Sequence, residues 1–364
     1  MFANSFQNSI VLASRQVAAE PGIIVGPIAR VFGFLMDWSF SIVYNFTTGN
    51  ALGLAIILLT SIVFLIMLPL NIRSQRAMNK VRTLKPQEEE IRKRYEGVTD
   101  SEKQKKMQEE IYAMYSKNGA NPLGGCLPML VQMPLFFGLF FIMNNVFLYI
   151  GPLNDLYRDI SVSLQNVPGM VNEVLLPMSI PLVPARWQDN AVELRRHIEA
   201  GMSLAEAEAQ VGEFIDLNRP EHLSRVLNRF SADQWEYVLS HVPAEYYQPI
   251  RDMYEHKVRI ITFVGFDLIQ ISGWRPPGIL IPILAALTSL LSSLLGRNST
   301  PSTGGNSMMG NQTIIMVVMP IFMGYITVTL PAGVGLYWIV QNIYRAIQQV
   351  ISAYRAGLPL FGTQ

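Results

Sequence analysis

The chain has 364 residues, of which 50% are hydrophobic and only 15% are charged, and its formal net charge is +1. A soluble domain carries about 25% charged residues, so this composition indicates a membrane protein. The single cysteine, Cys126, excludes an intramolecular disulfide framework and a cysteine-based zinc site.

The N-terminal part of the chain changes character near residue 26. The first twenty residues lack an apolar stretch long enough for a cleaved signal peptide, and no cysteine there could carry a lipid anchor. Residues 1–25 are therefore predicted to form an extracytoplasmic tail. The segment 26–46 is apolar but includes Arg30 and Asp37, which favours an amphipathic helix in the membrane interface over a spanning helix.

Five later segments are apolar and of membrane length, since a hydrocarbon core about 30 Å thick needs roughly 20 residues of helix. Only the last of them carries a charged side chain, Arg345, close to its end. The sequence therefore predicts an all-α membrane protein with five transmembrane helices. Their approximate bounds are Ala51–Leu70, Leu123–Ile150, Pro277–Leu295, Thr313–Leu330 and Ala332–Ser352.

The charges of the loops predict the orientation. The first two spans lie in residues 47–150, and the loop 71–122 between them holds twelve Lys or Arg and eight Asp or Glu. By the positive-inside rule this loop is cytoplasmic. Alternation then places the N-terminus and residues 151–258 outside. After the last three spans, in residues 259–352, the short tail 353–364 lies inside.

The cytoplasmic loop is predicted to form a helical hairpin. Pro86 suits the first turn of a helix, and Thr99 and Glu102 have capping-box spacing at the start of the second arm. The pattern is typical of a solvated, charged hairpin, which is marginally stable by itself and therefore mobile. Its apolar stripes consist of Ala77, Val81 and Leu84 on the first arm and Met107, Ile111 and Met114 on the second.

Residues 151–258 are predicted to form an inserted extracytoplasmic helical region of unknown role. Residues 151–187 show no clear hydrophobic period. Residues 189–256 are charged and contain capping-box pairs such as Ser231 with Gln234, which predicts four or five short helices there. The four histidines of the chain have no ligand spacing, so no metal site is expected.

The sequence contains no motif for covalent, nucleotide or metal chemistry, such as G-x-S-x-G, H-E-x-x-H or G-x-x-x-x-G-K-[ST]. We therefore predict that the protein is not an enzyme and has no cofactor and no direct nucleic-acid site. Uncharged polar residues inside the spans form either interhelical hydrogen bonds or a water-holding cavity, because amides at membrane depth need partners or water. The candidate residues are Thr60, Gln132, Asn144, Asn145, Tyr337, Gln341 and Asn342.

Three stretches resemble the YidC-type membrane protein insertase family, which includes Oxa-like and Albino-like members. They are "ALGLAIILLTSIVFLIMLPLNIRSQRAMNKVRTLKPQ", "NPLGGCLPMLVQMPLFFGLFF" and "MPIFMGYITVTLPAGVGLYWIVQNIYRAIQQ". The resemblance covers about residues 26–150 and 259–352. It implies a five-helix core around a hydrophilic groove that opens to the cytoplasm and to lipid, with the candidate residues as its lining.

The resemblance also implies a function. Such a protein inserts small or short-tailed membrane proteins into the bacterial cytoplasmic membrane, and helps them fold, without hydrolysing nucleotides. Its hairpin would receive nascent membrane proteins, and the lipid bilayer, the Sec translocon and the ribosome would be partners. The expected layout is similar to that of Gram-positive members.

One departure from the family concerns the groove. Family members carry an arginine five residues before a Leu-Pro-Leu proline, and counting back from Pro69 gives Phe64. Arg73 lies nine residues after Phe64, near the cytoplasmic boundary, so we expect a neutral, polar groove. Two other classes stay open. The chain could be a small-molecule channel or facilitator, or a membrane assembly scaffold that uses its outer helical region.

Overall fold

The computed structural model describes residues 25–97, 100–120, 127–183, 185–211, 214–296 and 312–355. The expectations for the N-terminal tail, for Cys126 and for the chain beyond residue 355 lie outside these residues. The described residues form α-helices, short 3-10 and π segments, and one two-stranded hairpin. The prediction of an all-α protein is confirmed.

The chain forms two compact units. The first unit comprises Met1–Ala55 and Gly138–Gln270, and the second comprises Ile56–Phe137 and Ile271–Gln364. Each unit therefore combines two stretches that are far apart in the sequence.

Helix α2 (Val25–Phe46) belongs to the first unit and covers the segment expected to be an amphipathic helix. It is apolar on two faces, which suits a helix in contact with lipid. Asp37 accepts a 2.9 Å hydrogen bond from the backbone nitrogen of Gly151. The buried face consists of Ala29, Phe32, Met36 and Phe40, and the exposed face includes Val31, Phe34 and Trp38.

Helix α8 (Gly151–Gln165) shows that the expected lack of a period in residues 151–187 is wrong. Its stripe at 4,3,4 spacing was readable, but the charged residues between its members obscured it. The stripe is buried and consists of Leu153, Tyr157, Ile160 and Leu164. The chain continues through the π-helix η2 (Met170–Leu175), α9 (Leu176–Ser179) and the 3-10 helix η3 (Ile180–Leu182).

Five short helices follow, as the sequence predicted for residues 189–256. At the start of α13, Ser231 and Gln234 form the expected capping box. Around α12, Ser161 Oγ of α8 lies 2.9 Å from Ser224 Oγ. The helices are α10 (Ala185–Glu199), α11 (Leu204–Val211), α12 (Pro220–Leu227), α13 (Ala232–Ser240) and α14 (Ala244–Ile261).

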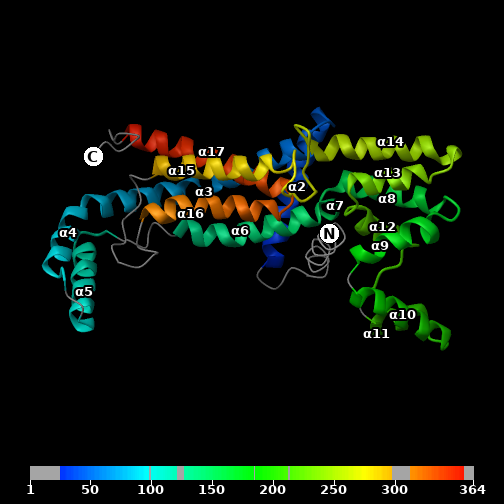
Figure 1. The fold of residues 1–364 in the computed structure, drawn as a ribbon, viewed down its shortest axis with the longest axis horizontal. Coiled ribbons are helices and arrows are strands. Elements are labelled where there is room, and N and C mark those ends of the chain that lie inside the picture. The colour runs from blue at the N-terminus through cyan, green and yellow to red at the C-terminus, as the bar shows by residue number, and fades with distance from the viewer. Residues whose placement is uncertain are drawn as a thin grey trace. The chain divides into compact units, whose positions relative to one another are not determined.

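Two of these five helices, α12 and α14, are held to the preceding part of the chain. Helix α8 packs against both α12 and α14, and the three helices lie in the green to yellow-green part of Figure 1. By contrast, α10 and α11 pack against each other around their own apolar cluster of Leu194, Ala207 and Val211. After α14, the strands β1 (Thr262–Phe263) and β2 (Phe266–Asp267) form an antiparallel hairpin.

The second unit contains the long helices α15 (Leu280–Gly296), α16 (Gln312–Val328) and α17 (Ala332–Arg355). It also contains most of α3 (Ala51–Thr83) and the first part of α6 (Leu127–Asn144), whose remaining residues belong to the first unit. Helix α15 packs along both α16 and α17 (Figure 1). Close approach depends on small residues, because a Cβ at Gly335 would lie 2.4 Å from Ile281 Cγ2.

By length and composition, one described helix is sufficient to cross a membrane, namely Ala51–Ala77. Four shorter apolar helices are Leu130–Asn144, Met170–Leu182, Leu280–Leu295 and Val317–Val328. The five-span arrangement therefore stays a prediction. Helices α15 and α16 also expose large apolar side chains, among them Leu287, Leu291, Ile321 and Phe322.

The second apolar segment is not one continuous helix, because α6 ends at Asn144 and the short helix α7 (Val146–Tyr149) follows. The side-chain amides of Asn144 and Asn145 donate to the carbonyls of Phe140 and Phe141, at 2.8 and 2.9 Å. Such contacts compete with the backbone hydrogen bonds of a helix, which accounts for the break.

The expected cytoplasmic hairpin consists of α4 (Lys85–Arg94) and α5 (Ser101–Lys117). Pro86 lies in the first turn of α4, as predicted. The N-cap of α5 is Asp100, whose side chain accepts a 3.0 Å hydrogen bond from the backbone nitrogen of Glu102. The expected cap at Thr99, which lies outside the described residues, is therefore wrong by one position.

Candidate functional site

The candidate site is a cluster of polar side chains on α6 and α17, built around Gln132. Its Nε2 atom donates a 2.6 Å hydrogen bond to the hydroxyl of Tyr337. Its Oε1 atom accepts from Gln341 Nε2 at 3.4 Å and from Arg345 Nη2 at 3.3 Å. One amide on α6 therefore contacts three side chains of α17, and these four residues are named the Gln132 cluster.

The spacing on α17 explains this arrangement. Tyr337, Gln341 and Arg345 are four residues apart, so they lie on successive turns of one helix face. Tyr337 and Gln341 are buried, at 1% and 3% exposure, whereas Gln132 and Arg345 are half-buried. The cluster therefore extends from a closed interior toward a position that solvent or a ligand reaches.

The same helix carries polar atoms that have no hydrogen-bond partner among the described residues. They are Gln341 Oε1, Gln348 Nε2 and Gln349 Oε1, and all three atoms are buried. An unpaired buried amide group costs free energy. This part of α17 is thus suited to contact with water or with a polar segment of another molecule.

Aromatic rings flank the cluster on both sides of α17. Phe136 of α6 stacks on Trp338, with ring centroids 5.2 Å apart. Tyr344 packs against Phe64 of α3 at 5.1 Å, and its hydroxyl lies 2.7 Å from Ser61 Oγ. These contacts fix α17 against α6 and α3 and thereby orient its polar face.

The expectation of a neutral cluster is wrong, because Arg345 contributes a guanidinium to it. Phe64 occupies the position where the resemblance predicts an arginine, and it packs against Tyr344, the neighbour of Arg345 in the chain. Within the described part of the chain, Arg345 forms no ion pair, and its guanidinium donates to the Gln132 amide oxygen. The sequence predicts Arg345 as a charged residue near the end of the last span and does not include it in the groove lining.

Among the described residues, the remaining predicted groove residues form their hydrogen bonds with atoms outside the Gln132 cluster. Thr60 is fully buried, and its hydroxyl donates to the Ile56 carbonyl of its own helix at 2.6 Å. Asn342 is directed toward α15, where its Nδ2 lies 3.4 Å from Thr288 Oγ1. Asn144 and Asn145 belong to the first unit and bond to carbonyls of α6.

The hairpin residues form an apolar cluster of their own. Val81, Leu84, Tyr115 and Ala120 are its buried members, and Ile111 and Met114 pack against it. Ala77 and Met107 are half-buried. Glu88 forms two polar contacts beside this cluster. Its carboxylate accepts a 2.5 Å hydrogen bond from the Tyr115 hydroxyl and forms an ion pair with Arg92 at 2.6 Å.

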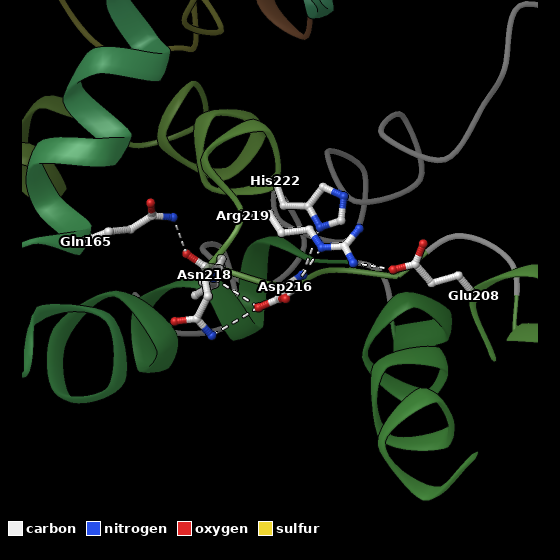
Figure 2. A network of polar contacts seen from close by, with 7 residues as sticks. Gln165, Glu208, Asp216, Asn218, Arg219 and His222 are labelled. Carbon is white, nitrogen blue, oxygen red and sulfur yellow. Dashed lines mark hydrogen bonds and ion pairs between the residues drawn. The ribbon is translucent and has the colours of Figure 1, made fainter. Parts of the chain in front are cut away.

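A second polar network lies in the first unit and is shown in Figure 2. Arg219 pairs with Glu208 and approaches Asp216, with 3.7 Å between Nε and Oδ2. The backbone nitrogen of Asp216 donates to His222 Nδ1 at 3.0 Å, and burial lowers the pKa of that imidazole. The charged side chain of Arg219 is paired with carboxylates of the same unit, so we interpret this network as a structural one that holds the loop before α12 in place.

The buried lysine of the first unit is also structural. Lys257 is 3% exposed, and its Nζ lies 4.3 Å from the ring centroid of Trp235 and 4.8 Å from that of Tyr254. Burial lowers the pKa of Lys257 to about 8, while the carboxylate of Asp267 opposes that change. The ammonium therefore ties α14 to α13 by cation–π contacts.

Across the described ranges, no group of three or more His, Cys, Asp or Glu side chains could hold a metal ion. The Gln132 cluster has no carboxylate or imidazole in contact with it among those residues. What the cluster offers is two amides, one phenol and one guanidinium. This set binds polar or anionic groups by hydrogen bonds.

Long apolar helices that hold such a cluster define a helical membrane protein with a polar interior. The family described as 60Kd inner membrane protein matches residues 42–178 and 237–356, well over half of the chain. The chain therefore belongs to this family, the YidC-type membrane proteins. The interval between the matched stretches, 179–236, is shorter than the expected inserted region 151–258.

Three relatives carry the name membrane protein insertase YidC. The protein of Syntrophobacter fumaroxidans is 24% identical over 322 residues, which cover 88% of this chain and 37% of the relative. That of Phocaeicola vulgatus is 34% identical over 46% of this chain and 28% of the relative. That of Wolinella succinogenes is 38% identical over 32% of this chain and 20% of the relative. The chain thus spans 37% or less of the length of these relatives.

Proposed function

We propose that the chain is a membrane protein insertase and chaperone of the bacterial cytoplasmic membrane. The observation that carries the proposal is the Gln132 cluster, in which Gln132 contacts Tyr337, Gln341 and Arg345 on successive turns of α17. Family membership and the names of the relatives support it.

The proposed mechanism needs no covalent step. A polar tail that crosses a membrane loses its hydration, and amide, phenol and guanidinium groups replace part of the lost hydrogen bonds. The apolar segment that follows the tail gains free energy on entering lipid, about 0.3–0.6 kcal/mol for each Leu, Ile, Phe or Val at the helix centre. Entry of the apolar segment therefore drives transfer of the tail.

The architecture that we propose for this function has five membrane helices, with the N-terminus outside and the C-terminus inside. The apolar side chains that α15 and α16 expose suit contact with lipid. The hairpin α4–α5 lies on the cytoplasmic side and receives incoming apolar segments. Its half-buried Met107 and Met114 support this role, because flexible methionines accommodate varied partners.

The proposed partners are nascent membrane proteins and the lipid bilayer. The family resemblance adds the Sec translocon and the ribosome as proposed partners. The segment 179–236, which the family does not match, is proposed to be an inserted extracytoplasmic part of the first unit, held by the packing of α8 against α12.

A reconstituted system tests the proposal. The purified chain is placed in phosphatidylcholine vesicles, and a single-span substrate with a short tail is added without nucleotide. We expect the tail to become protected from external protease in these vesicles but not in protein-free ones. Equal protection in both would contradict the proposal. Leakage of a trapped small solute without tail protection would favour the channel alternative instead.

A further inference from the structure

We propose that His222 makes the attachment of α10 and α11 to α12 sensitive to acid, so that this helix pair is released when the imidazole takes up a proton. The backbone N–H of Asp216 donates a 3.0 Å hydrogen bond to His222 Nδ1, which accepts it only while that nitrogen carries no proton. The residues involved lie in the segment 179–236, which the family does not match. The inference goes beyond the proposed insertase function and does not depend on it.

The first step concerns how α10 and α11 are attached. They pack against each other around the apolar cluster of Leu194, Ala207 and Val211, and Phe214 of the loop before α12 packs against that cluster. The ring of Phe214 also contacts the imidazole of His222, edge to face, with the ring centroids 5.4 Å apart. The imidazole therefore touches the residue that joins the helix pair to α12.

Arg219, the residue that precedes α12, forms a second link to the helix pair. Its guanidinium pairs with Glu208 of α11 and lies 5.2 Å from the ring centroid of Phe214. Figure 2 shows the Arg219 side chain beside His222 and directed toward Glu208. The charge of the imidazole therefore acts on this link as well.

The second step concerns what protonation changes. A protonated imidazole donates from both nitrogens, so Nδ1 of His222 stops accepting from Asp216 and the backbone N–H loses this partner. The new positive charge also lies near two cations, Arg219 and Arg225. The Nε atom of Arg225 is buried and has no hydrogen-bond partner among the described residues. Protonation thus removes a hydrogen bond and adds repulsion at the same place.

The third step concerns the direction of the pH effect. Burial is the largest cause of the lowered pKa of His222, and the cations Arg225 and Arg219 lower it further. The carboxylates of Glu221, on α12, and of Asp216 act in the opposite direction but do not outweigh these causes. The folded chain therefore favours the neutral imidazole. This stabilisation is complete above pH 6.5, the ordinary pKa of histidine, and is lost as the pH falls through the lower pKa of the folded chain.

The test measures the distance between α11 and α8 by pulsed electron paramagnetic resonance. Spin labels are attached at Gln210→Cys on α11 and at Arg158→Cys on α8, both exposed positions, in the full detergent-solubilised chain with Cys126→Ser. At about pH 7 we expect one narrow distance distribution. At about pH 5.5, which lies above the ordinary range of carboxylates, a broader second population should grow by about threefold to tenfold.

Three variants make the result specific. His222→Asn supplies an amide oxygen as acceptor and takes up no proton, so it should keep the narrow distribution at both pH values. His222→Lys introduces a cation and should show the second population already at about pH 7. His241→Asn removes a histidine from an exposed position after α13 and should keep the acid response of wild type. Far-UV circular dichroism at both pH values shows whether each variant is folded.

Three outcomes would overturn the inference. If wild type keeps the narrow distribution in acid, the helix pair is not released. If His222→Asn responds to acid as wild type does, another group carries the response. If the distribution broadens only together with loss of helical circular dichroism, acid unfolds the chain and the attachment is no switch. The insertase proposal is tested separately by protease protection in vesicles, so its failure would be distinguishable from each of these results.

Discussion

The hydroxyl of Tyr337 accepts a 2.6 Å hydrogen bond from Gln132 Nε2, which joins the last helix of the chain to α6. Both residues lie in apolar segments, where a lone amide and a lone phenol would each be costly. By pairing, they hold the Gln132 amide so that its oxygen is directed to Gln341 and Arg345. The pair thus orients the polar face on which the proposed function depends.

The first prediction concerns this amide. Gln132→Leu removes the contact with Tyr337 and the acceptor of Arg345, so insertion of a short-tailed substrate should fall by roughly tenfold. The midpoint of thermal unfolding should change little, since interhelical polar contacts in membranes average about 0.6 kcal/mol. Both quantities are measured on the same vesicle preparation.

Thr60→Val is the matched control. It removes a buried hydroxyl that donates to the Ile56 carbonyl of its own helix, and it should leave insertion near the wild-type level. If both variants lowered insertion to the same extent, the Gln132 cluster would have no special role.

Most helices of the second unit could be predicted from sequence, because their apolar length and their flanking charges are local properties. Pairings between helices could not be predicted in this way. Gln132 and Tyr337 are 205 residues apart, and no period in the sequence relates them. Their contact depends on how α6 and α17 pack, which the aromatic rings of Phe136 and Trp338 determine.

Arg345 shows why the charge of the site was misjudged. Its sequence position near the end of a span is typical of an arginine that extends to the membrane surface. In the structure the side chain turns to Gln132 instead. The amphipathic pattern of α8, in contrast, was present in the sequence and was missed. Its charged positions face outward between the buried Tyr157 and Ile160.

The hairpin provides the second prediction. Tyr115→Phe removes the 2.5 Å hydrogen bond to Glu88, a carboxylate that is 6% exposed. The loss should destabilise the hairpin by about 1–3 kcal/mol, because one oxygen of a buried carboxylate is left unpaired. Hydrogen exchange of α4 and α5 measures this change. Tyr112→Phe, at a 66% exposed position of α5, should leave the exchange as it is.

The third prediction concerns pH and Lys257. Burial lowers the pKa of this lysine from 10.5 to about 8 in the folded chain. The unfolded chain therefore binds more protons between these two values, and the free energy of unfolding should rise as the pH increases above 8. Burial raises the pKa of Tyr157 and of Tyr254 above 10.0, which acts in the opposite direction once unfolded tyrosines ionise.

The measurement should therefore stay below the tyrosine range, from about pH 7.5 to 9.5. We expect the midpoint of thermal unfolding of the detergent-solubilised chain to rise across this interval, and Lys257→Met to remove the rise. Lys103→Met, at an exposed position, should keep it. A rise that persists in Lys257→Met would assign the pH dependence to another group.

The fourth prediction separates the two parts of the segment 179–236. Replacement of residues 189–211 by a flexible linker of equal length removes α11 and most of α10 with their own apolar cluster, and the rest of the first unit should stay folded. Deletion of all of 179–236 also removes α12 and exposes the face of α8 that carries Ser161. That deletion should cause aggregation, which size-exclusion chromatography detects. If the two variants aggregated to the same extent, α10 and α11 would not be separable from the rest of the first unit, and the prediction would be wrong.

The most direct test of the central claim is photo-crosslinking from position 132 to a substrate that is halted during insertion. A photoreactive amino acid at position 132 should crosslink to the polar tail of the substrate, while one at the exposed Leu287 of α15 should not. Crosslinks to the tail from position 287 with none from position 132 would contradict the account, because the tail would then pass outside the Gln132 cluster.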